Sequence, residues 1–336
     1  MGVMIKDPAK IKNILVVSLT NIGDVVLTFP VIDILKQDFS QAKLSVVVGP
    51  KGAPLLANNP VIHKIYIYDK KVSFYKIVAW FIDLRKEKFD LIVDLRNTAL
   101  PFFLFTHHRT SPVLKRNLQE HMRLQHLKRL ASIYPYQRES AYRFTLNLDR
   151  GDKKYINDLL TPHLGHDPLY VVVSPGAADD AKRWNEEGFA QVCDKITENY
   201  FLKIILAGDE KDRLIGEKIA AKMKTPPLNL CGQTTLTQLA CLLQRSQWAL
   251  VNDSGVMHLA SYLNVPVIAL FGPSDPRRYG PWSSQSHVIE KRESCEKKNV
   301  PTREWIHAIE SNDVLAVIED LMRQKSFLGH HEKRLF

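Results

Sequence analysis

The sequence contains few cysteines and no long apolar run. Its four cysteines share no metal-ligand spacing, and they are Cys193, Cys231, Cys241 and Cys295. This pattern predicts free thiols in a reducing compartment and argues against a structural zinc. The first apolar run, from Ile14 to Leu19, is too short for the core of a signal peptide or for a membrane span. We therefore expect a cytoplasmic protein.

Two further absences narrow the class of protein. We find no short-period repeat, which argues against a solenoid, and no acidic pair with D-x-D spacing that would hold a metal ion.

The 336 residues suffice for two domains with separate cores. The formal net charge of +10 favours acidic partners. Charge alone does not distinguish nucleic acid, a phosphorylated sugar and an anionic membrane surface.

The stretch from Trp248 to Pro276 predicts a β-α-β unit. An apolar run up to Val251 is followed by a turn at 252–255, and apolar residues then recur at helical spacing over 256–263. A second apolar run, rich in β-branched residues, covers 266–271 and ends in a loop with glycine and proline.

The turn at Ser254 and Gly255 is the first candidate site. It lies at a helix N-terminus, where unpaired N–H groups and the helix dipole favour an anion such as phosphate. Gly255 lets a ligand approach the backbone closely, and His258 lies one turn into the helix. Taken by itself, the stretch fits equally well a helix that Asp253 or Ser254 merely caps and in which His258 only packs.

The N-terminal half has a similar plan. We expect strands at 13–18, 44–48, 64–68 and 89–95, a helix that starts near Thr28, and another at 72–86. This alternation indicates a mostly parallel sheet covered on both faces. Asp24 follows the first strand, beyond the edge where open α/β sheets bind ligands. Read locally, Asp24 is either a helix cap or a catalytic residue.

The most basic segment lies between Pro101 and Leu130. It contains arginines, lysines and histidines, the single acid Glu120, and an apolar run at 101–105. A solvated helix face, a site for an acidic amphipathic acceptor, or a membrane-binding surface would each explain this composition. Arg116 and Arg123 are the candidates for binding an acceptor.

The chain divides into two similar α/β domains. We expect an N-terminal domain over 1–150, ending in a strand at 142–148, and a linker with one helical piece over 151–168. The second domain is expected over 169–310, with strands at 170–174, 203–207 and 228–230 and helices at 186–199, 211–223 and 236–243. Ser311 then caps an amphipathic helix over 311–328.

Loops at the carboxyl ends of strands in the second domain carry further candidates. Gly176 follows the first strand, and Lys182 precedes the next helix. Asp209 and Glu210 follow the second strand, and Gly272 ends the run at 266–271. Glycine-containing backbone and an ammonium group suit a diphosphate, and a carboxylate suits a ribose or sugar hydroxyl. Because such loops meet in one crevice, they predict a nucleotide-diphosphate site.

Three motifs together resemble the ADP-heptose:lipopolysaccharide heptosyltransferases of glycosyltransferase family 9. They are ILVVSLTNIGDVVLTFPVIDIL, PGAADDAKRW and VNDSGVMHLASYLNVPVIALFGPSDP. The resemblance covers nearly the whole chain. It implies the α/β architecture called GT-B, in which two Rossmann-like domains face across a cleft and a C-terminal helix returns to the first domain. The N-terminal domain would bind the acceptor and the C-terminal domain the nucleotide sugar.

The resemblance also implies roles for matching residues. Asp24 matches the proposed general base, and Lys182 matches the lysine that contacts the donor phosphates. Glu210 best matches a donor-binding carboxylate, with Asp209 as an adjacent alternative.

The donor-binding turn of the family matches Asp253, Ser254 and Gly255, and the histidine after it matches His258. Three departures are present, and one is that the region around Cys295 has a single cysteine where many relatives have several. Ala177 and its neighbour stand where some members have threonine, so only backbone groups would contact phosphate there. The segment at 101–130 matches no family motif, which leaves the acceptor open.

The implied reaction is inverting transfer of heptose from ADP-heptose to an acidic lipopolysaccharide core acceptor. Fixed positive groups would stabilise the leaving diphosphate, so no metal or other cofactor is expected. The implied partners are the donor, the acceptor and the cytoplasmic face of the inner membrane, with no nucleic acid. Three alternatives remain: another nucleotide sugar as donor, a nucleotide-sugar epimerase of the same fold, and a two-domain binding protein of the periplasmic kind. The epimerase would need an acid–base pair and no acceptor, and the absence of a signal peptide argues against the binding protein.

Overall fold

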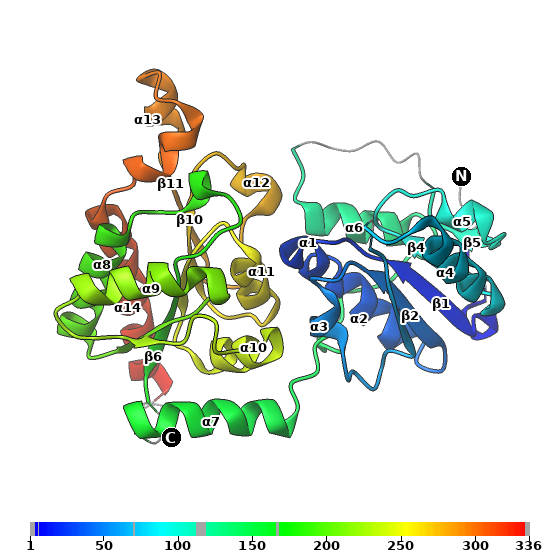
Figure 1. The fold of residues 1–336 in the computed structure, drawn as a ribbon, viewed down its shortest axis with the longest axis horizontal. Coiled ribbons are helices and arrows are strands. Elements are labelled where there is room, and N and C mark those ends of the chain that lie inside the picture. The colour runs from blue at the N-terminus through cyan, green and yellow to red at the C-terminus, as the bar shows by residue number, and fades with distance from the viewer. Residues whose placement is uncertain (1–3, 6, 70, 112–118, 166–167, 333–336) are drawn as a thin grey trace. The chain divides into compact units, whose positions relative to one another are not determined.

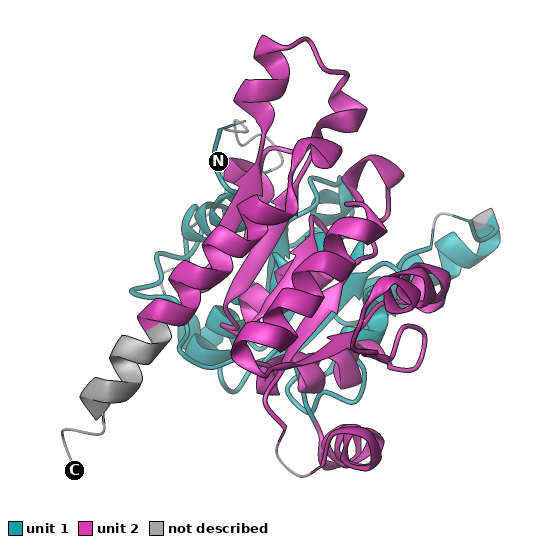
Figure 2. Ribbon diagram, turned by 90° about the vertical axis from the view of Figure 1, so that its left-hand side faces the viewer, with its two compact units in different colours: residues 1–148 teal, residues 149–336 magenta. Residues whose placement is uncertain are grey.

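The chain folds into two compact units, residues 1–148 and 149–336 (Figure 2). The structure is a computed structural model, and it describes all residues except 1–3, 6, 70, 112–118, 166–167 and 333–336. Each unit has its own parallel sheet.

The sheet of the first unit has the order β3-β2-β1-β4-β5 (Figure 1). Its strands are β1 (Asn13–Val17), β2 (Lys43–Val48), β3 (Lys64–Ile67), β4 (Leu91–Asp94) and β5 (His108–Arg109). All pairs are parallel, and Val17 lies opposite both Val47 and Asp94. The order changes direction between β1 and β4, so the loops after these two strands flank the switch point where such sheets bind ligands.

Helices connect the strands of this unit. They are the 3₁₀ helix η1 (Pro8–Lys10) and the α-helices α1 (Ile22–Val26), α2 (Phe29–Asp38), α3 (Ala53–Leu56), α4 (Phe74–Lys86), α5 (Leu100–Phe103) and α6 (Met122–Ala131). As predicted, the regular helix starts near Thr28, which is the N-cap of α2, with Pro30 in the first turn. The residues before it form the separate short helix α1.

The strand predicted at 142–148 is wrong. This segment has no regular secondary structure, because side chains rather than a neighbouring strand satisfy its backbone. The backbone N–H of Thr145 donates to the carboxylate of Asp33 at 2.8 Å, and the Asn59 amide donates to the carbonyls of Phe144 and Thr145 at 2.8 and 2.9 Å. Of residues 142–148 only Thr145 and Leu146 are buried, so the alternating sequence pattern does not correspond to alternating burial.

The sheet of the second unit has the order β11-β10-β9-β6-β7-β8, again with parallel pairs. Its strands are β6 (Tyr170–Ser174), β7 (Lys203–Leu206), β8 (Leu228–Asn229), β9 (Ala249–Asn252), β10 (Val267–Phe271) and β11 (His287–Glu290). Every residue of β6, β9 and β10 is buried, as expected for central parallel strands. The switch point lies between β6 and β9. The edge strands β5 and β11 were not predicted.

The described residues of the second unit contain eleven helices, the last of which is α14. They are α7 (Arg150–Leu164), η2 (Asp180–Lys182), α8 (Glu186–Tyr200), η3 (Glu210–Asp212), α9 (Arg213–Lys222), α10 (Leu236–Arg245), α11 (Gly255–Tyr262), α12 (Pro276–Tyr279), α13 (Arg292–Lys297), η4 (Thr302–Ala308) and α14 (Ser311–Glu332). Local capping explains several starts: Asp149 caps α7, Asn185 caps α8, and Thr235 forms a capping box with Gln238 at α10.

Two segments pack within the second unit. The expected linker, predicted with one helical piece, is mostly the helix α7, which contacts α10 and has Ile156 and Leu160 buried. The apolar stripe of α14 is buried in the core of the second unit, where α14 contacts α8, and the return of this helix to the first domain stays a prediction. This stripe consists of Val314, Ile318 and Leu321.

Candidate functional site

Asn252 joins the loops at the switch point of the second unit. Its buried side chain donates to the carbonyl of Pro175, after β6, at 2.7 Å. It also accepts from the backbone N–H of Trp184 at 3.3 Å. One amide therefore fixes the loop after β6, the residue that follows Lys182 and Arg183, and the end of β9. The sequence analysis placed Asn252 in a turn and missed this role.

Lys182 and Asp253 form the central contact of the site. The Nζ atom of Lys182, at the end of η2, lies 2.7 Å from Oδ2 of Asp253. The Asp253 side chain is 6% exposed and that of Lys182 is 30% exposed. A buried carboxylate thus holds the ammonium at the carboxyl edge of the sheet, and the ammonium keeps a face open to a ligand.

The N-terminus of α11 supplies the adjacent donors. Ser254 is the N-cap residue with an extended backbone, yet its side chain makes no capping hydrogen bond. Its Oγ atom is buried and has no hydrogen-bond partner among the described residues. Because a buried polar atom normally has a partner, the hydroxyl and the first N–H groups of α11 are suited to an anion. The capping interpretation of Ser254 is therefore wrong for its side chain.

His258 packs within the second unit. Its imidazole is 5% exposed and is stacked on Trp282, with ring centroids 5.8 Å apart and planes 28° apart. This contact fixes the ring one turn into α11. Packing on Trp282 is the role that the structure records for His258, and a role in donor binding stays a prediction.

The loop after β7 presents three carboxylates in different environments. Asp209 caps η3 through Lys211 N–H, and Glu210 is 72% exposed and pairs with Arg213 at 3.0 Å. Asp212, which the sequence analysis did not select, accepts from Asp209 N–H at 3.0 Å. Burial raises the pKa of Asp212 above its ordinary value.

The Asp212 carboxylate is packed against two glycines at the carboxyl ends of β6 and β7. A Cβ atom on Gly176 would lie 2.2 Å from it, and one on Gly208 would lie 2.5 Å from it. Only glycine allows this approach. Of the three acids, Asp212 is thus the one that reaches the loop after β6.

Gly272 has a packing explanation. A Cβ atom there would lie 2.9 Å from the carbonyl oxygen of Ala181 and 3.0 Å from Cβ of Ile306. The glycine lets η2 approach the end of β10, and it thereby supports the position of Lys182.

In the first unit, Asp24 lies in the first turn of α1, at the carboxyl end of β1. The N-cap of this helix is Asn21, so the interpretation of Asp24 as a cap is wrong. The Asn21 amide donates to Oδ2 of Asp24 at 3.1 Å. The preceding loop packs closely on the next strand end, since a Cβ atom on Gly49 would lie 2.7 Å from Thr20. Asp24 is half-buried and held at the switch point of its sheet.

Part of the basic segment anchors α6. Arg129 is buried and donates to the carbonyl of Asp94 at 3.0 Å and to the Asn97 side chain. His126 is also buried, and burial together with nearby Arg129 lowers its pKa to about 3. Buried Arg129 and His126 contradict a purely solvated helix face for this segment.

The structure describes only one of the two acceptor candidates. Arg116 lies outside the described residues. Arg123 pairs with Glu139 at 2.6 Å, and its side chain is 16% exposed. A role for either residue in binding an acceptor stays a prediction.

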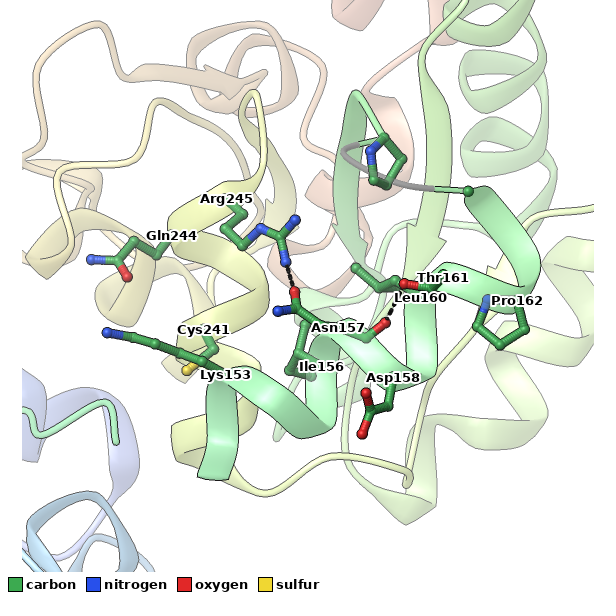
Figure 3. A pocket seen from close by; sticks show the side chains of 12 residues that line it. Lys153, Ile156, Asn157, Asp158, Leu160, Thr161, Pro162, Cys241, Gln244 and Arg245 are labelled. Atoms are coloured by element: carbon green, nitrogen blue, oxygen red, sulfur yellow. Dashed lines mark hydrogen bonds between the residues drawn. The ribbon is translucent and has the colours of Figure 1, made fainter. Parts of the chain in front are cut away.

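A pocket of about 800 Å³ lies between α7 and α10 (Figure 3). Arg245 of α10 donates to Asn157 of α7 across it, and Cys241 lies in its wall. None of the predicted site residues lines this pocket. It is a feature of helix packing separate from the switch point.

The described residues contain no group of three or more His, Cys, Asp or Glu side chains that could hold a metal ion. The four cysteines are free and buried, as predicted. None of the helices described is both long and apolar enough to cross a membrane.

Comparison with known proteins connects these features. Residues 78–306 match the profile of "Glycosyltransferase family 9 (heptosyltransferase)". The "Lipopolysaccharide heptosyltransferase 3" of Escherichia coli is 28% identical over 331 residues, with 89% of this chain and 96% of that protein covered. The "Lipooligosaccharide heptosyltransferase 2" of Haemophilus ducreyi is 27% identical over 314 residues, covering 82% of this chain and 88% of that protein.

Solved structures show the same fold. A glycosyl transferase family 9 protein from Veillonella parvula superposes with a TM-score of 0.78 at 22% identity, covering 95% of this chain and 99% of that one. The E. coli ADP-heptose LPS heptosyltransferase II superposes with a TM-score of 0.75 at 24% identity, covering 94% and 99%. These likenesses and the two parallel sheets confirm the predicted α/β fold of two Rossmann-like domains, the GT-B class.

Proposed function

Because the chain belongs to glycosyltransferase family 9, we propose that it transfers a heptose from ADP-heptose to an acidic sugar of a lipopolysaccharide core. The chain is an enzyme of the glycosyltransferase type. The heptose is supported by the names of its relatives, which are lipopolysaccharide or lipooligosaccharide heptosyltransferases. ADP-heptose is the donor named for the similar E. coli structure.

The observation that carries this proposal is the pair of groups at the switch point of the second unit. The ammonium of Lys182 and the unpartnered hydroxyl of Ser254 lie with the N-terminus of α11, next to the backbone at Gly255. A diphosphate bound there would meet one full positive charge, one hydroxyl and the first N–H groups of the helix. These groups would bind the diphosphate more strongly as it gains negative charge on leaving.

The other donor contacts are assigned by position. Asp253 orients Lys182, and the loop at Gly176 presents backbone to the phosphates. Glu210, or its neighbour Asp209, binds the donor as the family resemblance implies, and Asp212 is a third carboxylate at the same strand end.

Gly272 supports η2, and His258 of α11 packs on Trp282, while its role in donor binding stays a prediction. Both lie next to the elements that carry the proposed phosphate contacts.

Asp24 is the proposed general base. The acceptor hydroxyl attacks the anomeric carbon, a C–O bond forms to it, and the bond from that carbon to the ADP oxygen breaks. Asp24 takes the hydroxyl proton, and the configuration at the anomeric carbon inverts. Since Lys182 and α11 carry the charge stabilisation, the reaction needs no metal and no other cofactor.

The acceptor is proposed to contact the first unit, with Arg116 and Arg123 as the candidate residues. A lipid-linked acceptor also implies work at the cytoplasmic face of the inner membrane by peripheral contact. No nucleic acid is proposed as a partner.

The test is an assay of nucleoside diphosphate release from a panel of nucleotide sugars, with and without delipidated lipopolysaccharide core. We expect ADP release from ADP-heptose only when the core acceptor is present, and release slowed about 30- to 1,000-fold in the Lys182→Ala variant. If nucleoside diphosphate were released only from another nucleotide sugar, that sugar rather than ADP-heptose would be the donor. Conversion of the donor sugar without any acceptor would identify an epimerase.

A further inference from the structure

Helix α4 in the first unit turns apolar side chains toward the solvent. Tyr75, Val78 and Ile82 are 84%, 39% and 50% exposed. Their spacing of three and four residues places them on one face of the helix. The opposite face of α4 packs inward, since Leu84 is fully buried in the core. A soluble surface helix would carry polar residues on its outer face, so this outer face needs an explanation.

The segment after β4 extends the same apolar surface. Phe102, Phe103 and Phe105 are 45%, 61% and 77% exposed. Phe103 contacts Phe81 of α4 edge to face, with ring centroids 6.4 Å apart. Arg85 of α4 lies over the ring of Phe105 at 5.4 Å. These contacts make α4 and the α5 segment one surface. We call the six exposed side chains the aromatic patch: Tyr75, Val78, Ile82, Phe102, Phe103 and Phe105.

Positive charges border the aromatic patch. Arg85 and Lys86 are exposed at the end of α4, and Arg109 lies 4.5 Å from the ring centroid of Phe102. The two acids of the helix region, Asp83 and Glu87, are both paired with Lys64, at 2.9 and 3.2 Å. The charge that this surface offers to a partner is therefore positive.

We propose that the aromatic patch binds the surface of an anionic lipid membrane. Exposed aromatic and branched side chains enter the headgroup region of a bilayer, while Arg and Lys beside them bind lipid phosphates. A second copy of this chain is a poorer partner, because a symmetric contact would bring the same cations face to face. This inference adds a membrane-binding surface to the proposed function. It rests on the proposed function only in that a lipid-linked acceptor would be bound at this surface.

The test is co-sedimentation of the full chain with vesicles. One set contains only phosphatidylcholine, and the other contains phosphatidylcholine with about a third phosphatidylglycerol. We expect binding to the anionic vesicles, about tenfold or more weaker binding to the neutral ones, and loss of binding at high salt, because exposed charges are screened. Failure to bind anionic vesicles, or equal binding to both sets, would overturn the proposal.

Variants locate the surface. Tyr75→Ser combined with Phe105→Ser removes the two most exposed members of the aromatic patch and should lower binding to anionic vesicles at least tenfold. Arg85→Glu combined with Lys86→Glu should do the same. The matched control is Leu214→Ser on α9, an apolar side chain that is 61% exposed outside the aromatic patch, and it should bind like the wild type. Melting curves confirm that each variant is folded.

Two further readouts separate the possible failures. ADP release with the soluble delipidated core should be unchanged in the patch variants, so loss of vesicle binding is distinct from loss of activity. If no nucleotide sugar is a substrate, the vesicle experiment still decides the membrane question. A wild-type dimer that becomes a monomer in the Tyr75/Phe105 variant, without any vesicle binding, would assign the patch to self-association and refute the proposal.

Discussion

The ammonium of Lys182 is held 2.7 Å from the buried carboxylate of Asp253, although the two residues are 71 positions apart in the chain. The contact joins η2 to the start of α11, and so it places a positive charge beside the N-terminus of a helix. Before the donor binds, Asp253 compensates the lysine and fixes its position. Under the proposed function, the lysine is thus already in place when the diphosphate binds, and little reorganisation is needed.

Lys182→Ala should therefore lower kcat/KM for the donor. The loss of a preorganised positive group at the leaving diphosphate typically costs about 2 to 4 kcal/mol, or about 30- to 1,000-fold in rate. Because Asp253 acts through Lys182, the Lys182→Ala/Asp253→Asn double variant should be little worse than Lys182→Ala alone. Steady-state kinetics of Lys182→Ala, Asp253→Asn and the double variant measures this. Lys218→Ala, which removes an exposed lysine 3.7 Å from Glu186, is the control and should behave like the wild type. Strictly additive losses would refute the coupling.

The β-α-β units could be predicted because each is encoded locally. The run at 248–251 is apolar throughout, the turn that follows has capping residues, and α11 and β10 show their own periodicity. The same reasoning failed at 142–148, where the side chains of Asp33 and Asn59 bind the backbone in place of a neighbouring strand. The edge strands β5 and β11 were missed because they contain few apolar residues: none in β5, and only Val288 and Ile289 in β11.

Site residues that belong to a sequence motif were predicted, whereas residues whose role depends on packing were missed. Lys182 and Asp253 were selected from motifs, but their ion pair depends on how two loops meet. Asp212 and Asn252 were not selected, because their importance arises from Gly176 and from Pro175, which are distant in sequence. Residue types alone do not reveal which of several acids in one loop turns inward.

Asp212 provides a second test. Asp212→Ala should raise KM for the donor more than it lowers kcat, because the carboxylate supports the loop at the phosphates rather than the reacting atoms. Gly176→Ala should act in the same direction, since its methyl group would occupy the position of that carboxylate. Asp320→Ala on α14, where the side chain is 68% exposed, is the matched control. Unchanged donor KM in both site variants would exclude Asp212 from the donor site.

His126 makes the stability of the protein depend on acidity. Its pKa is about 3 in the folded protein and about 6.5 when unfolded, so the unfolded chain binds the proton more readily. The stability from keeping this histidine neutral is fully present above about pH 6.5 and is lost as the pH falls toward 3, at up to about 1.4 kcal/mol per pH unit. Between pH 7 and 5, His126→Gln should lose about 2 kcal/mol less stability than the wild type in urea unfolding. Equal losses in the two proteins would contradict this.

Removal of divalent metal should leave the activity intact. The positive groups proposed to stabilise the leaving ADP are Lys182 and the N-terminus of α11, which belong to the protein itself. We expect the same rate of ADP release in EDTA as in magnesium. Activity that disappears in EDTA and returns with magnesium would show that a metal ion shares this role.

Replacement of Asp24 by asparagine tests the central claim most directly, since Asp24 is the proposed general base. The Asn21 amide lies 3.1 Å from Asp24, and the helix is capped by Asn21, so the substitution should leave α1 folded. The measurement is turnover with ADP-heptose and the core acceptor, alongside the affinity for ADP and the melting temperature. We predict a fall in turnover of roughly 10² to 10⁴, the usual contribution of a general base, with ADP affinity and melting temperature close to those of the wild type. Turnover near the wild-type rate would contradict the account, because the acceptor proton would then leave by another route.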